Sequence, residues 1–225
     1  MTFSITARCE KTGQFGFAVS SSSPAVAARC AFARANVGAV STQNITDPSL
    51  GETGLSLLKD GMSAQAALDH IVANTNHIQY RQLSIVDTTG ETACFSGEKT
   101  LGVHATSNEK NVACAGNLLS GTHIPEAMIQ AFQASEGHLA DRLLVAMKAA
   151  VNAGGEEGSI HSAGLLIVDK VSWPIVSLRV DWNDAGTPIE ELEKLWGIYQ
   201  PQCDDYVTRA LDPSAAPSYG VPGDE

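Results

Sequence analysis

The chain has 225 residues, with 14 Lys and Arg against 25 Asp and Glu and a formal net charge of −11. This length suits one large domain, or one domain with a short appendage. The 44% of hydrophobic residues excludes a disordered chain. Because an acidic chain repels phosphate groups, we expect neither nucleic acid nor an anionic membrane as a partner.

The cysteines and the N-terminus indicate the compartment. Five cysteines are widely spaced, with no C-x-x-C pair, so neither a disulfide framework nor a zinc site is predicted. The first residues lead directly into a strand pattern and do not resemble a signal peptide. No apolar run approaches the roughly 20 residues needed to cross a bilayer. We therefore expect a cytoplasmic protein.

The opening residues predict a β-hairpin. Apolar and polar residues alternate over 2–8, which is the period of a strand, and Gly13 permits the turn into a second strand over 14–20. The Ala-rich segment 25–35 suits a helix and a strand equally well. The small and β-branched residues of 37–43 predict a buried strand.

Pairs of helices alternate with pairs of strands along the rest of the chain. Helical periodicity and end signals predict helices over 50–59, 64–72, 125–134, 138–153 and 187–199. Apolar runs and alternation predict strands over 80–87, 91–96, 111–115, 162–168 and 175–181.

This order of elements predicts an α+β fold. Hairpins favour largely antiparallel sheets, and paired helices between strand groups suit two stacked sheets with a helical layer outside each. We therefore predict a four-layer αββα sandwich over residues 1–200. Residues 201–225 are rich in Pro and Asp and are expected to form a tail without a core of its own.

Thr2 is the first candidate for catalysis. Its side chain is small enough for Met1 normally to be removed in the cytosol, which would leave a hydroxyl and a free α-amine on one residue. An α-amine has a pKa of roughly 7.7–8.0, so it can take the hydroxyl proton directly or through one water. The Met-Thr start is common among non-catalytic chains, so further context is needed.

Five blocks supply that context: MTFSITAR, SSSPAVAARCAFARANVGAVSTQN, YRQLSIVD, CAGNLLSG and GGEEGSIHSAGLLIV. In this order they resemble the bacterial family known as domain of unknown function 1028, over about residues 2 to 200. The resemblance implies an N-terminal-nucleophile (Ntn) hydrolase-like fold of the proteasome type. It also implies an amide-hydrolase architecture with Thr2 in the nucleophile position.

The chain departs from a proteasome-like site at two places. Such a site has an acid after its second strand and a lysine near its third. Strand counting puts the place of the acid near Ser20 and Ser21. It puts the place of the lysine near Arg34, or near Arg29 if the register slips. A hydroxyl supplies no negative charge, and Arg cannot act as a base. Arg can still lower the pKa of the amine or bind a substrate carboxylate. These residues are therefore candidates for binding an anionic small molecule, in an enzyme or in a protein that has lost hydrolysis.

Three amides complete the candidate site. Asn117 follows a strand and is a candidate oxyanion donor, with a turn-stabilising role beside Gly116 as the alternative. Gln43 and Asn44 end a buried strand and are candidates for recognising an amide or ureide, with loop capping as the alternative.

Other chemistries lack a pattern. The six histidines have no metal-ligand spacing, and Cys30 and Cys114 have no neighbour that would activate a thiol. No phosphate-binding glycine motif occurs. We therefore predict neither a metal nor a cofactor.

These observations predict an Ntn amidohydrolase that acts on an amide, lactam or ureide bond of a small metabolite. The alternatives are a non-catalytic αββα protein that binds a metabolite, and an oligomeric assembly protein. A homo-oligomer is expected, since stacked sheets with outer helices often associate. Trp173, Trp182 and Trp196 suit such an interface or the core equally well.

Overall fold

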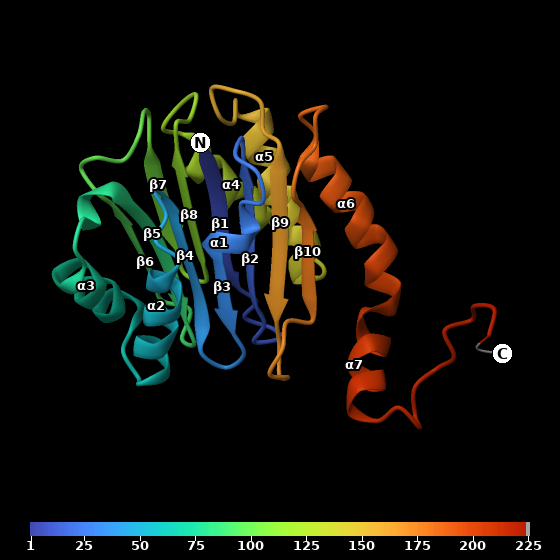
Figure 1. Ribbon diagram of the computed structural model, residues 1–225. Coiled ribbons are helices and arrows are strands. Elements are labelled where there is room, and N and C mark those ends of the chain that lie inside the picture. Colours follow the sequence, from blue (N-terminus) through green and yellow to red (C-terminus); the bar gives the residue numbers. More distant parts are fainter. Residues whose placement is uncertain (224–225) are drawn as a thin grey trace.

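The computed structural model describes residues 1–223 and has two sheets stacked face to face, with helices outside each (Figure 1). The strand order is β10-β9-β2-β1-β8-β7 in the larger sheet and β3-β4-β5-β6 in the smaller one. All pairings between these strands are antiparallel. The predicted αββα sandwich is confirmed.

The elements are bounded as follows. The larger sheet contains β1 (Thr2–Arg8), β2 (Phe15–Ser21), β7 (Ala105–Glu109), β8 (Val112–Asn117), β9 (Ser162–Val168) and β10 (Val176–Val180). The smaller sheet contains β3 (Ala31–Arg34), β4 (Gly38–Asn44), β5 (Arg81–Asp87) and β6 (Thr92–Ser96). The helices are α1 (Ala27–Cys30), α2 (Ser49–Lys59), α3 (Ala64–Asn74), α4 (Ile124–Ala134), α5 (Leu139–Asn152), α6 (Pro188–Tyr199) and α7 (Cys203–Leu211), with 3-10 turns η1 (Ile78–Tyr80) and η2 (Gln200–Gln202).

The two faces of β1 differ chemically, as the alternation predicts. Phe3, Ile5 and Ala7 are buried in an apolar cluster with residues of α4 and α5. Ser4 and Thr6 point the other way and contact the smaller sheet. Because side chains alternate across a strand, β1 joins a helix-covered core on one face to the space between the sheets on the other.

Polar side chains fill part of the space between the sheets. Ser4 Oγ donates to Gln43 Oε1 at 2.6 Å, and the hydroxyl oxygens of Thr6 and Ser84 are 2.8 Å apart. We call this set the inter-sheet polar layer; it consists of Ser4, Thr6, Ser41, Gln43, Gln82 and Ser84, all fully buried. Because each lost hydrogen bond would leave a buried polar group unpaired, the layer favours one register of the sheets.

The sequence left one segment open and missed the structure of two others. Residues 25–35 divide between α1 and β3. The polar strand β7 was not predicted, because at a sheet edge its pairing with β8 replaces apolar alternation. The expected tail begins with η2 and α7, since Cys203 is buried in the main core and acidic residues occupy the first turn of α7.

Residues 212–223 follow α7 and extend away from the sandwich (Figure 1). Residues 224–225, the end of that predicted tail, lie outside the described residues. Within residues 1–223, no helix has both the length and the apolar character that crossing a membrane requires.

Candidate functional site

The start of β1 and the ends of β2 and β8 meet at one end of the larger sheet, next to the N-terminus. Thr2 pairs with Asn117 across β1 and β8, and Phe3 pairs with Ser20 across β1 and β2. This register brings Thr2, Asn117 and Ser21 to the same end of the sheet. Thr2 and Asn117 are both buried there.

The Thr2 hydroxyl lies in a small group of oxygen atoms. Thr2 Oγ1 donates to the Met1 carbonyl oxygen at 2.5 Å and is 3.3 Å from Ser21 Oγ. The Ser21 hydroxyl donates to the same carbonyl. With Met1 attached, two hydroxyls therefore converge on the carbonyl of the Met1–Thr2 peptide bond.

A chain of hydroxyls connects Thr2 to a guanidinium. Ser21 Oγ is 2.8 Å from Ser23 Oγ, which accepts a 2.7 Å hydrogen bond from Arg29 Nη2. Arg29 also donates to the carbonyls of Pro24 and Ala25, which hold it against its own loop. The structure therefore connects Arg29 to Thr2 through the hydroxyls of Ser23 and Ser21.

Asn117 and Gln43 meet at a residue that sequence reasoning missed. Gln82 Oε1 accepts from Gln43 Nε2 at 2.7 Å and from Asn117 Nδ2 at 3.2 Å. Gln82 Nε2 donates to the Gly116 carbonyl at 2.9 Å. Gln82 therefore fixes the Asn117 amide beside Thr2, while Gln43 lies deeper, in the inter-sheet polar layer. The available signal was that Gln82 alternates with Ser84 in β5, which puts two polar side chains on the same face of a buried strand.

The structure does not bring the other candidates to Thr2. Ser20 donates to the Ser162 carbonyl at 3.0 Å and lies on the helix-covered face of β2 with Phe3. Asn44 Nδ2 donates to the Tyr80 carbonyl at 2.6 Å, which is a loop-capping contact.

Arg34 lies at the opposite end of the sheets. It pairs with Gly38, the first residue of β4, whereas Gln43 near the far end of β4 contacts the Thr2 side of β1. Its guanidinium forms a 2.8 Å ion pair with the exposed Glu52. An exposed pair of this kind contributes little to stability.

The acid near the N-terminus is Glu156, which sequence reasoning also missed. It lies between α5 and β9 and is only 7% exposed. Glu156 Oε2 accepts from the Ser22 backbone N–H at 3.3 Å, whereas Oε1 is buried and has no hydrogen-bond partner in the described structure. Burial raises the pKa of Glu156 to about 8, against the opposing attraction of the chain's α-amino group.

Two glycines shape the loop that carries Glu156. Gly154 and Gly155 have φ values of 115° and 57°, which residues other than glycine rarely adopt. The pair turns the chain back from α5, so that Glu156 forms a β-bridge with Leu119 next to the end of β8. An acid directly after two glycines in GGEEGS was therefore the overlooked signal.

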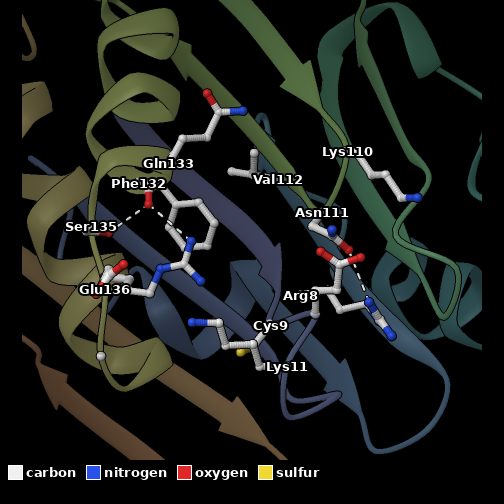
Figure 2. A pocket seen from close by; sticks show the side chains of 13 residues that line it. Arg8, Cys9, Lys11, Lys110, Asn111, Val112, Phe132, Gln133, Ser135 and Glu136 are labelled. Atoms are coloured by element: carbon white, nitrogen blue, oxygen red, sulfur yellow. Dashed lines mark hydrogen bonds between the residues drawn. The ribbon is translucent and has the colours of Figure 1, made fainter.

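Two cavities lie near opposite ends of β1. A cavity of about 240 Å³ near the start of β1 is lined by Phe3, Glu156, Gly158 and Glu190, among others, and lies on the helix-covered side of β1, where Phe3 rather than Thr2 reaches it. The second, of about 310 Å³, is at the Arg8 end, where the Arg142 guanidinium lies 4.0 Å from the centre of the Phe132 ring (Figure 2). The strand β1 separates this second cavity from the Thr2 site.

No group of three or more His, Cys, Asp or Glu side chains that could hold a metal ion occurs within residues 1–223. The polar groups around Thr2 are hydroxyls, amides and one carboxyl. These groups are suited to proton transfer and to binding a carbonyl oxygen.

The layer order defines an αββα sandwich, with the buried Thr2 hydroxyl at the start of the central strand β1. Residues 2–192 match the family of unknown function DUF1028, and the chain belongs to this family.

Two solved structures are similar to this chain. Protein SPO2555 from Silicibacter pomeroyi, described as a DUF1028 protein, has a TM-score of 0.82 and 30% identity, covering 88% of this chain and 89% of that one. Anbu, an ancestral β-subunit from Yersinia bercovieri, has a TM-score of 0.39 and 9% identity, covering 89% of this chain and 95% of that one. A similarity as low as the second carries no inference about function. No curated protein matches the sequence.

Proposed function

We propose that this protein is an Ntn amidohydrolase that cleaves an amide, lactam or ureide bond in a small metabolite, with Thr2 as nucleophile after removal of Met1. The observation that carries the proposal is the position of the Thr2 hydroxyl. It is buried at the end of the larger sheet where β1 begins, 3.3 Å from the Ser21 hydroxyl, on the residue that pairs with Asn117 across β8.

The reaction follows from having a hydroxyl and an amine on one residue. The α-amine of Thr2 takes the Oγ proton while Oγ forms a bond to the substrate carbonyl carbon. The resulting ammonium gives a proton to the leaving nitrogen, and the carbon–nitrogen bond breaks. Water then attacks the ester on Oγ, which releases the acid product and restores Thr2.

The neighbouring groups support each step. Asn117 Nδ2, positioned by Gln82, and backbone N–H groups are the proposed donors to the oxyanion. Arg29 acts through Ser23 and Ser21 to favour the neutral amine. Ser21 and Arg29 are therefore the predicted binding residues that the proposal uses, and a substrate that carries an anionic group near Arg29 fits it.

Intact mass and two substitutions test the proposal. The purified protein should lack Met1, and a panel of N-acyl amides, lactams and ureides should include one that it hydrolyses. Thr2→Ala should lower that rate by at least about 10³-fold, whereas Thr2→Ser, which retains the hydroxyl and the amine, should keep measurable turnover. Unchanged turnover in Thr2→Ala would contradict the proposed mechanism.

The alternative is a non-catalytic protein that binds a metabolite or builds an oligomer. One observation favours it: the Thr2 and Ser21 hydroxyls are already bonded to the Met1 carbonyl, so a chain that keeps Met1 has no free amine on Thr2. Retention of Met1 with specific ligand binding and no turnover would support this alternative. The cytoplasmic location and the homo-oligomer remain predictions; light scattering tests the second.

A further inference from the structure

Glu156 is the buried ionisable group near Thr2 that the mechanism above does not use. Only 7% of its surface is accessible to solvent, and in the described structure one of its two carboxyl oxygens has no hydrogen-bond partner. A buried carboxyl with an unused acceptor is costly unless something occupies that acceptor. The cavity of about 240 Å³ that it lines gives space for such a partner.

The loop around Glu156 is next to the first residue of the chain. The carbonyl of Met1 accepts from Ser21, while the backbone N–H of the following residue, Ser22, donates to Glu156. The Met1 side chain lies against Gly158, where an added Cβ would be 3.0 Å from Met1 Cε. The positive charge of the α-amino group also acts on the Glu156 carboxyl.

We propose that Glu156 is the positioning residue for the Thr2 α-amine: after Met1 is removed, its free carboxyl oxygen accepts a hydrogen bond from that amine. This inference rests on the proposed function. A proteasome-like site has an acid after its second strand, where this chain has Ser20 and Ser21. In this chain Glu156, from the loop between α5 and β9, would take the place of that acid.

The local chemistry explains how the pair would work. Removing Met1 takes away the carbonyl to which Thr2 and Ser21 donate, so both hydroxyls become available to the amine and the substrate. A carboxylate with an ordinary pKa would hold the amine as ammonium at neutral pH. Because burial keeps Glu156 largely protonated there, the resting amine stays free to act as a base. When the amine takes the Oγ proton, the Glu156 oxygen stabilises the ammonium by a charge-assisted hydrogen bond.

Other charged groups near Glu156 are few. Among the residues that line its cavity, Glu190 at the start of α6 is the only other ionisable side chain, and Arg29 acts from the side of β2 through Ser23. His161 follows the loop, but its backbone N–H bonds Ser21 and its ring bonds the Asn183 carbonyl. Glu157 is exposed and adjacent, so it is a matched control.

The test measures the Thr2 amine directly and needs no substrate. Chains that begin at Thr2 are produced as ubiquitin fusions and trimmed by a deubiquitinase. Competitive acetylation with acetic anhydride across pH 6–10, read by mass spectrometry, gives the pKa of the Thr2 amine. In Glu156→Gln the proton affinity of the amine above about pH 8 should fall by about tenfold, since wild-type Glu156 is ionised there and its carboxylate favours the ammonium. Glu157→Gln and Glu190→Gln should leave it within about twofold of wild type.

An unchanged amine pKa in folded Glu156→Gln would overturn the inference, as would an equal fall in Glu157→Gln. If Glu156→Gln does not fold, Glu156→Asp replaces it: the retracted carboxyl should give a smaller fall, and no fall would overturn the inference. The result is independent of turnover. If Glu156→Gln leaves the pKa of the Thr2 amine unchanged while the wild type hydrolyses a substrate, the role of Glu156 is refuted and the proposed function stands. If Glu156→Gln lowers that pKa but the wild type hydrolyses no substrate, the proposed function is refuted.

Discussion

The strongest physical prediction concerns the pH dependence of stability at Glu156. Its pKa is about 8 in the folded protein, against an ordinary value of 4.5. The folded state therefore binds this proton more tightly than the unfolded state does. The stability from this group is fully present below about pH 4.5 and is lost as the pH rises through about 8. Replacement by Gln, which is neutral at every pH, removes the dependence.

The size of the effect follows from the interval between the two pKa values. Each pH unit in that interval changes the free energy of unfolding by up to about 1.4 kcal/mol. Between pH 5 and pH 9 the stability of the wild type relative to Glu156→Gln should therefore fall by on the order of 4 kcal/mol. Glu156→Gln should be the more stable of the two at pH 9, because Gln carries no charge to bury.

Urea denaturation at pH 5, 7 and 9, followed by circular dichroism, measures this difference. Glu157→Gln removes one carboxyl from the same loop at an exposed position, so it corrects for the change in net charge. A wild type minus Glu156→Gln difference that stays constant from pH 5 to pH 9 would refute the reasoning. A difference that grows with pH would show that Glu156 is stabilised in its ionised form.

Two further substitutions test the packing around the site. Gln82→Leu leaves the amides of Gln43 and Asn117 without their acceptor, so the free energy of unfolding in urea should fall by on the order of 4 kcal/mol; a loss under about 1 kcal/mol would contradict the network. Removing residues 201–225 exposes the core around the buried Cys203, so thermal unfolding should show a loss of about 2 kcal/mol in a chain that still folds. Light scattering on the same truncated chain measures whether the segment contributes to association, and a truncated chain that cannot fold would contradict the second expectation.

Much of the fold follows from local patterns. The alternation over 2–8 predicted β1 because its two faces meet different surroundings, a helix-covered core and a second sheet. The cap at Ser63, whose side chain accepts from Ala66, marked the start of α3 correctly. Such patterns depend on neighbours within a few positions, so a sequence displays them openly.

β7 and α7 show where local patterns end. The five residues of β7, ATSNE, have no apolar alternation, and they form a strand because β8 offers an unpaired edge. The composition of 201–225 indicated a tail, yet α7 forms where Cys203 can reach the main core. In both cases a surface made by distant residues outweighed the local preference.

The candidate site divides in the same way. Thr2 was identifiable from its position and chemistry, because a hydroxyl and an α-amine on one residue need no partner. Its surroundings depend on strand order and register: Ser22 and Glu156 are 134 positions apart in the chain, and Gln82 and Asn117 are 35 apart. The proposed nucleophile is thus a property of one residue. The surroundings of Thr2, which are Glu156, the amide network and the distance to Arg34, are set by how the sheets and the α5–β9 loop pack. Hydrogen bonds between side chains require positions within a few ångströms, which a linear pattern does not encode.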